Sequence, residues 1–131
     1  EQVGGAQRCP EMSVDYAKTR YQFGRPIGSF QSIKHRCAEM YMKVEHAKST
    51  AYHVVRVVDD AHEFAVAAPL AGSVCSEVYN WAAGETIQVH GGIGFTWEHD
   101  AHLYLKRAKA SSLLLGDARY QRRLLGHAIG L

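Results

Sequence analysis

This sequence of 131 residues has little of the material on which several common protein classes depend. Its three cysteines have no CxxC spacing, which favours reduced thiols in the core over disulfides and suits a cytoplasmic protein. No apolar stretch approaches the roughly 18 to 20 residues that span a bilayer, so we expect no membrane partner. The net charge is only +2, with basic and acidic residues interspersed, so we expect no nucleic-acid partner either.

The chain also lacks an initiator methionine and a signal segment before Glu1, so we expect it to be a piece of a longer polypeptide. Its length is that of one ordinary domain, which we place over residues 1–131. No internal repeat or low-complexity tract divides it.

Glycine and proline are absent between Gly28 and Pro69, and apolar residues recur there at helical spacing. This pattern predicts one long helix that runs to about Asp59, with Ser29 as its N-cap. A second predicted helix begins at Pro69, because proline is favoured in first helical turns, and ends at the glycines that start with Gly91.

Three shorter helical segments complete the prediction. The upstream segment stops before Gly24, and Pro10 is expected to kink any helix that runs through from residue 1. Downstream, residues 100–110 and 113–127 form two helices joined at Ser111 and Ser112. No convincing strand pair is present. The sum predicts an all-α fold, an antiparallel four-helix bundle with the short segment 94–112 as an extra helix.

Two segments at predicted helix ends carry the groups that point to function. The first, RYQFGRPIGSFQ at residues 20–31, offers a permanently charged guanidinium at Arg20, an aromatic face at Phe23 and an amide at Gln31. The second, QVHGGIGF at residues 88–95, ends a helix on glycines that leave N–H groups free and let the backbone approach a ligand.

Phosphates bind guanidinium and N–H groups, and flat rings stack on aromatic side chains. The two segments together therefore predict a site for a large, flat, phosphorylated cofactor such as a flavin dinucleotide. We expect these helix-end groups, at the two extremities of the bundle, to converge on one nucleotide that is shared with another protomer.

The same segments resemble the C-terminal helical domain of FAD-dependent acyl-CoA dehydrogenases. The resemblance rests on YAKTRYQFGRPI at residues 16–27, FQ at residues 30–31 and QVHGGIGFT at residues 88–96, in the order and spacing of that family. It covers essentially the whole chain. The stretches at residues 1–7 and 28–35 look most like actinobacterial members, some of which act on steroid side chains.

The resemblance implies an FAD cofactor that spans a subunit interface and is bound mainly by a neighbouring protomer. The residues implied to contact it are Arg20, Gln22, Phe23, Gln31, Gln88, Val89, His90, Gly91, Gly92 and Asp117. In this arrangement Arg20 pairs with the pyrophosphate, Gln31 hydrogen-bonds the pyrophosphate or the ribose, and Phe23 packs near the adenine. The resemblance also implies missing N-terminal helical and middle β-domains, a homotetramer or heterotetramer, and an electron-transfer flavoprotein as partner.

The implied chemistry is α,β-dehydrogenation of an acyl-CoA thioester, in fatty acid or steroid metabolism. A carboxylate removes the α-proton and the flavin accepts a hydride. The family's usual base is a glutamate just before a Gly-Thr pair, and this position falls on Leu115, followed by Gly116 and Asp117. Leucine cannot accept a proton, and Asp117 lies about 200° further round a helix, so we assign no catalytic residue in this chain.

Three explanations for Leu115 stay open. The base lies on the helix that precedes Glu1, or the chain is a non-catalytic subunit that pairs with a different chain carrying the base. In the third, the chain is a helical binding or structural module with no redox role. In each case we expect the isolated domain to be inactive.

His99 and His102 are three residues apart, which places them on one face of a helix. No further cysteine or glutamate ligand is positioned by the sequence, so we expect no metal site there.

Overall fold

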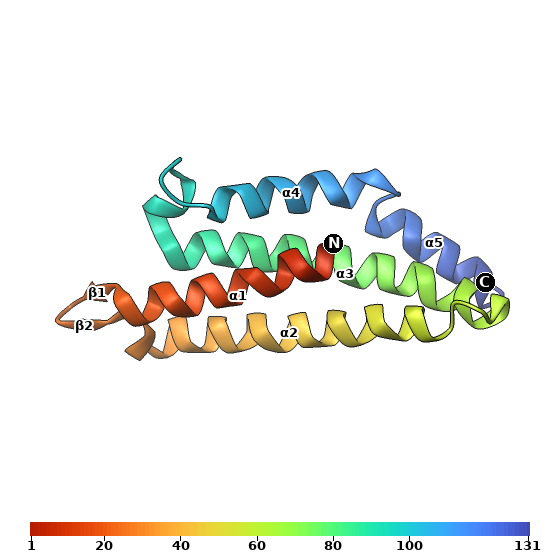
Figure 1. Cartoon of the computed structure of the whole chain (residues 1–131), viewed down its shortest axis with the longest axis horizontal. Helices are drawn as coiled ribbons and strands as arrows, with labels where there is room; N and C mark the ends of the chain where they lie inside the picture. The colour runs from red at the N-terminus through yellow and green to blue at the C-terminus, as the bar shows by residue number, and fades with distance from the viewer.

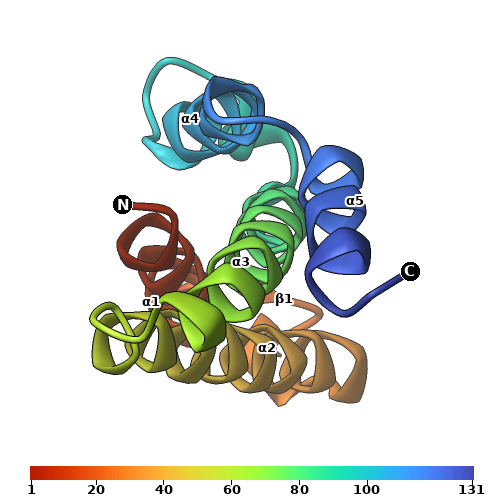
Figure 2. The ribbon, with the colours of Figure 1, turned by 90° about the vertical axis from the view of Figure 1, so that its right-hand side faces the viewer.

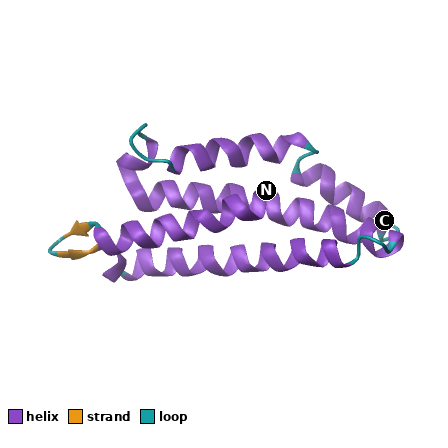
Figure 3. Cartoon of the chain, viewed as in Figure 1, coloured by secondary structure: helices purple, strands orange, loops and turns teal.

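The computed structural model describes all residues, 1–131, and is dominated by helices. The chain contains five α-helices, two short strands and two short 3₁₀-helices. In chain order the elements are α1 (Gln2–Thr19), β1 (Tyr21–Gln22), β2 (Arg25–Pro26), η1 (Ile27–Ser29), α2 (Gln31–Arg56), α3 (Ala61–His90), η2 (Gly91–Phe95), α4 (Ala101–Leu114) and α5 (Ala118–Ala128). Figure 3 shows how little of the chain lies outside helices.

The helices form an antiparallel bundle. Helices α1 and α3 run toward one end of the molecule, while α2 and α4 run back from it, and α5 continues from α4 toward the opposite end (Figure 1). Viewed along the bundle, α3 lies in the middle and is surrounded by α1, α2, α4 and α5 (Figure 2). This arrangement confirms the predicted all-α antiparallel bundle, with α4 and α5 together as its fourth member.

Small side chains fill the core where α1, α3 and α4 meet. Ala6 and Cys9 from α1 pack with Tyr79 from α3 and Ala108 from α4. Small residues let helices approach closely, and the fully buried Tyr79 then fills the space beside Gly5, where a Cβ atom would overlap its ring. All three cysteines are buried and free, and burial raises the pKa of Cys9 to about 11.

Helix α3 begins earlier than predicted, at Ala61 instead of Pro69. The carboxylate of Asp60 accepts hydrogen bonds from the N–H groups of His62 and Glu63, both at 3.0 Å, and so caps the helix. Pro69 therefore lies inside the helix. Its ring is buried in the bundle, and the helix lacks one backbone hydrogen bond there because proline has no N–H.

Two expectations near the other helix ends are also wrong. Ser29 is not the N-cap of α2, because it lies in η1, where its hydroxyl donates to the Pro26 carbonyl at 2.7 Å. Ser111 and Ser112 are not a joint, because their hydroxyls donate to carbonyls one turn back and both residues stay within α4. The chain turns instead at Leu115–Asp117.

A strand pair that the sequence did not predict follows α1. Strands β1 and β2 pair antiparallel, with Tyr21 opposite Pro26 and Gln22 opposite Arg25. Between them, Phe23 and Gly24 have φ values of 53° and 76°, and two positive values in succession are typical of the tight hairpin turn that matches strand twist. Helix α1 runs from Gln2 through the buried Pro10 without a break.

The α-helices are all too short or too polar to cross a lipid bilayer.

Candidate functional site

The two segments singled out in the sequence lie at the same end of the bundle. Helices α1 and α3 both end there, so the hairpin β1–β2 and the turn η2 project from one end of the molecule (Figure 1). The ring of Tyr16, in the last turns of α1, stacks on the ring of His90, the last residue of α3, with centroids 4.5 Å apart. The expectation that these groups sit at two extremities of the bundle is therefore wrong, and their proximity does not require assembly.

Arg20 is fixed by its backbone and free at its side chain. It is the C-cap of α1, and its N–H donates to the Tyr16 carbonyl at 2.8 Å. Its own carbonyl accepts from the N–H of Ile27 at 2.8 Å, which ties the base of the hairpin to the helix end. The side chain is exposed and makes no ion pair, so the guanidinium is available to an anion.

The hairpin tip presents an aromatic ring to solvent. Phe23 is 90% exposed, and its ring meets that of Phe30 edge to face with centroids 6.0 Å apart. The guanidinium of Arg25 lies 4.1 Å from the centre of the Phe30 ring on this side. The tip therefore packs against Phe30, at the start of α2, and still leaves the Phe23 ring free for a flat ligand.

Two exposed amides flank this ring. Gln22 lies in β1 and Gln31 is the first residue of α2. The Nε2 atom of Gln31 is 3.4 Å from the Nε2 atom of His35, one turn along the helix, which is a long contact. Both amides can therefore turn toward a ligand at this end of the bundle.

The glycine turn after α3 combines buried and exposed residues. The side chain of Gln88 is exposed, whereas Val89 is buried against Cys37 and Met40 and offers only its backbone to a ligand. Gly91 has φ 63° and ψ −139°, a conformation open to glycine alone. A Cβ atom at Gly91 or at Gly92 would meet no atom within 4 Å.

His90 anchors this turn from inside. Its side chain is 3% exposed, and Nδ1 donates to the Thr86 carbonyl at 2.8 Å, because a carbonyl can only accept. The proton therefore lies on Nδ1, and the buried Nε2 has no hydrogen-bond partner. Burial lowers the pKa of His90 below its ordinary value of 6.5, so the imidazole is neutral at pH 7. Its other face meets the ring of His99, with centroids 4.2 Å apart.

Asp117 and Leu115 do not lie with these groups. They belong to the turn between α4 and α5, and the 14 residues of α4 separate this turn from η2, about 21 Å at 1.5 Å per residue. Asp117 caps α5 by accepting from the N–H of Tyr120 at 2.7 Å. Leu115 is 80% exposed and lines a cleft of about 470 Å³ together with Glu1 and Gln2 at the start of α1.

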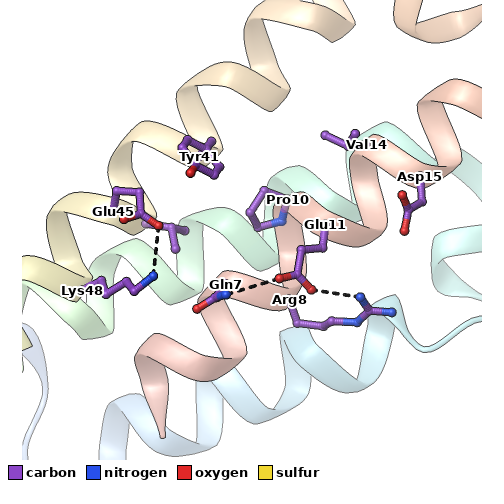
Figure 4. Close-up of a pocket in the computed structure, with 10 residues that line it drawn as sticks. Gln7, Arg8, Pro10, Glu11, Val14, Asp15, Tyr41, Glu45 and Lys48 are labelled. Carbon is purple, nitrogen blue, oxygen red and sulfur yellow. Dashed lines mark hydrogen bonds and ion pairs between the residues drawn. The ribbon is translucent and has the colours of Figure 1, made fainter.

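Another groove, between α1 and α2, contains none of the residues implied to contact FAD (Figure 4). Its two cations are already paired, because Arg8 binds Glu11 at 2.9 Å and Lys48 binds Glu45 at 3.3 Å. This groove therefore offers no free cation to a phosphorylated ligand.

Sequence reasoning missed Tyr16 and His99 as parts of this site. Both rings pack against His90, although they lie 74 and 9 residues away along the chain. No spacing in the sequence signals the contact with Tyr16, because it depends on how α1 packs against α3. For His99, the only signal is its position shortly after the glycine turn.

Comparison with known proteins gives a family. The family described as acyl-CoA dehydrogenase, C-terminal domain, matches residues 1–130. The chain is 46% identical to the acyl-CoA dehydrogenase IpdE2 of Mycolicibacterium smegmatis, over 95% of this chain and 39% of that protein. It is 28% identical to subunit CarC of the caffeyl-CoA reductase–Etf complex of Acetobacterium woodii, over 95% of this chain and 33% of CarC.

The fold matches as well. The solved structure of butyryl-CoA dehydrogenase from Megasphaera elsdenii superposes with a TM-score of 0.93 at 30% identity, over 98% of this chain and 33% of that one. The chain thus spans between a third and two fifths of the length of these relatives.

Proposed function

Because the chain belongs to the acyl-CoA dehydrogenase family and matches its C-terminal domain, we propose that it completes the FAD site and the oligomer interface of a flavin-dependent acyl-CoA dehydrogenase. The observation that carries this proposal is the position of Arg20 and the glycine turn at one end of the bundle, beside the exposed ring of Phe23. The longer enzyme would oxidise an acyl-CoA thioester between its α- and β-carbons. Residues 1–131 by themselves would be inactive.

The residues at this end fit an FAD molecule. The unpaired guanidinium of Arg20 suits the pyrophosphate, and the exposed amides of Gln22 and Gln31 suit the pyrophosphate or the ribose. Gly92 has no positive φ and no neighbour that a Cβ would touch, so nothing within the chain requires glycine there. A ligand that approaches the backbone closely would account for it. FAD, when bound, supplies the acceptor for the hydride, and the residues of this chain bind and orient it.

At the end of α3, some residues would contact FAD with their side chains and others with their backbone. Gln88 would use its exposed amide, whereas Val89 and His90 would contribute backbone groups because their side chains are buried. Asp117 lies at the far end of α4, so any FAD molecule that it contacts would be a different one from that held by Arg20.

The catalytic base would not come from the turn between α4 and α5. Leu115 has no titratable group, and the carboxylate of Asp117 is engaged in capping α5. Glu1 lines the same cleft as Leu115, but Arg107 binds both of its carboxylate oxygens at 2.7 Å and lowers its pKa. Glu1 would therefore be a poor base at neutral pH.

Two sources of the base are consistent with this cleft. The start of α1 lies beside Leu115, so a carboxylate on a helix that continues α1 upstream would reach the same place. Alternatively, the chain is the non-catalytic subunit of a heteromeric dehydrogenase, and a related chain carries the base. The exposed Leu115 favours this second candidate, because no side chain of the chain replaces the missing carboxylate.

Membership of the same family suggests the substrate, the partner subunits and the electron acceptor. We propose a fatty acyl-CoA or steroid-side-chain acyl-CoA as substrate, related dehydrogenase subunits in a homotetramer or heterotetramer, and an electron-transfer flavoprotein as electron acceptor. The similarity to CarC, whose name places it in a complex with an Etf, supports the last of these. The buried, reduced thiols are consistent with the cytoplasm.

The proposal is tested by replacing Arg20 in the intact protein. A hydrogen bond to a charged group contributes about 1.5 to 3 kcal/mol, so Arg20→Ala should weaken FAD binding by about 10- to 150-fold. Lys18→Ala is the matched control, because Lys18 is an exposed cation in the last turn of the same helix. Flavin absorbance per subunit after gel filtration measures the result.

Equal flavin content in the two variants would contradict the role of Arg20. A wild-type protein that carries no flavin and binds none would favour the helical structural module without a redox role.

A further inference from the structure

A second cleft lies next to the proposed FAD contacts and has no assigned role. It has a volume of about 410 Å³ and opens between the C-terminal half of α1 and the segment that leads into α4. Its lining includes three carboxylates, Asp15, Glu98 and Asp100, and the rings of Tyr16 and His90.

The carboxylates in this cleft are not neutralised within the chain. Asp15, Glu98 and Asp100 are exposed and form no ion pair. The one cation in the lining, Arg8, is bound to Glu11 at 2.9 Å, and this contact outweighs its attraction to Asp15. The cleft therefore carries an excess of negative charge.

His90 adds a hydrogen-bond acceptor that has no donor. Its Nδ1 donates back into α3, the rings of Tyr16 and His99 pack against its ring, and His90 lines the cleft together with both of them. Nε2 is buried and unpartnered. Buried polar atoms are hydrogen-bonded in the great majority of cases, so this atom points to a donor from outside the chain.

We infer that this cleft receives an arginine side chain of a neighbouring protomer. A guanidinium has five N–H donors in a planar fork, so it can donate to Nε2 of His90 and to the carboxylates at once. Its flat face also stacks on an aromatic ring such as that of Tyr16. A lysine fits less well, because its charge is compact and it does not stack. A metal ion fits less well, because no group of three ligand side chains converges here.

The neighbouring protomer is the expected source because of where the cleft lies. Thr19, in its lining, precedes Arg20, and His90 precedes Gly91. These are the groups that the proposed function directs toward a cofactor bound mainly by another protomer, so the inference rests on that proposed function. The arginine would then link assembly of the oligomer to the position of the glycine turn.

The test neutralises the cleft in the full-length protein. The variant Asp15→Asn/Glu98→Gln/Asp100→Asn removes three negative charges from exposed side chains without changing their size, and asparagine remains a good residue at the start of α4. Glu45→Gln is the control for the loss of a surface carboxylate, in the groove between α1 and α2. Circular dichroism confirms that the variants are folded.

Two measurements follow assembly. Sedimentation velocity over a dilution series should show self-association weakened about tenfold or more in the triple variant, since a charge pair at an interface is lost, and unchanged in Glu45→Gln. Modification with phenylglyoxal, mapped by mass spectrometry, should find one arginine that is protected in the wild-type oligomer and reactive in the triple variant.

Unchanged association together with unchanged arginine reactivity would overturn the inference. So would an arginine that is equally protected in the dissociated protomer, because it would then belong to the same chain. Flavin content separates this outcome from that of the proposed function. If Arg20→Ala loses flavin while the triple variant assembles normally, only the role of the cleft is refuted. If the triple variant assembles weakly while Arg20→Ala keeps its full flavin content, only the FAD contact of Arg20 is refuted.

Discussion

Gly91 and Gly92 are neighbours in the same turn, and only one of them has a backbone conformation that requires glycine. Gly91 has φ 63° and ψ −139°, whereas Gly92 has no positive φ. A Cβ atom would meet no neighbour at either position. Gly91→Ala therefore tests the backbone alone, and Gly92→Ala tests whether something outside the chain lies against the turn.

The expected magnitudes follow from this difference. Holding alanine in the conformation of Gly91 costs about 1 to 3 kcal/mol. With an unfolding entropy of about 2.1 cal/mol/K per residue over the chain, the melting temperature of Gly91→Ala should fall by roughly 4 to 11 °C. Gly92 lies in a helical turn in open space, so Gly92→Ala should change the free energy of unfolding by no more than about 0.5 kcal/mol.

Thermal unfolding followed by circular dichroism measures the stability of both variants, and flavin absorbance of the full-length protein measures binding. If the backbone of Gly92 approaches FAD closely, Gly92→Ala should lower flavin affinity by about tenfold, or 1.4 kcal/mol, while its melting temperature stays that of the wild type. A Gly91→Ala variant that melts within a degree of the wild type would refute the backbone argument. Full flavin content in Gly92→Ala would refute the close approach.

Three further outcomes follow from the packing, the capping and the burial of particular residues. Gly5→Ala should destabilise the protein by about 1 to 3 kcal/mol, because the added methyl group overlaps the buried ring of Tyr79. Gly4 is exposed and has no neighbour, so Gly4→Ala should be neutral or stabilising by up to about 1 kcal/mol. Urea unfolding compares the two variants, and equal stabilities would contradict the overlap. Asp117→Ala should lower the free energy of unfolding by about 0.5 to 2 kcal/mol, because α5 loses its cap. Asparagine can still cap the helix, so Asp117→Asn should keep most of this stability. If Asp117→Asn is no more stable than Asp117→Ala in urea unfolding, the effect is not capping. Burial lowers the pKa of His90 in the folded state, so the unfolded chain binds the proton more tightly. The contribution of neutral His90 to stability is therefore complete above pH 6.5 and is lost as the pH falls from 6.5 toward the lowered pKa. The melting temperature of a His90→Gln variant should depend less on pH over this range.

The long helices were predictable because their signal is repeated many times. Helix α2 presents an apolar residue every three or four positions, and each further turn repeats the same information. The first turns of α3 were missed because residues 61–65 are all exposed and carry no apolar period. Their start is marked only by Asp60 and by Glu63 three residues later, a weaker local signal than the presence of Pro69.

The short elements depended on interactions that single residues do not announce. The hairpin β1–β2 has two residues in each strand, too few for an alternating pattern, and its turn uses Phe23 in a positive φ that asparagine or glycine usually occupies. The Ser111–Ser112 pair suggests a joint between two helices when the sequence is considered alone. In the helix the two hydroxyls donate to the carbonyls of Ala108 and Lys109, one turn back, so both residues stay helical.

The site was predictable in its groups and not in its geometry. Residue chemistry identified the guanidinium, the aromatic ring and the bare glycine turn. Their position at one end of the bundle depends on α1 and α3 running in the same direction, and the stacking of Tyr16 on His90 depends on their register. Neither quantity has a local signal in the sequence, because both are fixed by packing between segments more than 70 residues apart.

The two ends of α4 have separate consequences for activity. The turn η2 precedes this helix and Leu115 follows it, about 21 Å further along the bundle at 1.5 Å per residue. If the glycine turn contacts one cofactor and position 115 faces a reaction centre, the loss of a carboxylate at 115 would leave the FAD contacts of the same chain intact. A subunit without a base would then still be needed by its neighbour, because its Arg20 and Gly92 would hold the neighbour's flavin. In a mixed oligomer, Arg20→Ala in this chain should therefore lower the flavin content of the partner's site, whereas Leu115→Ala should leave it unchanged.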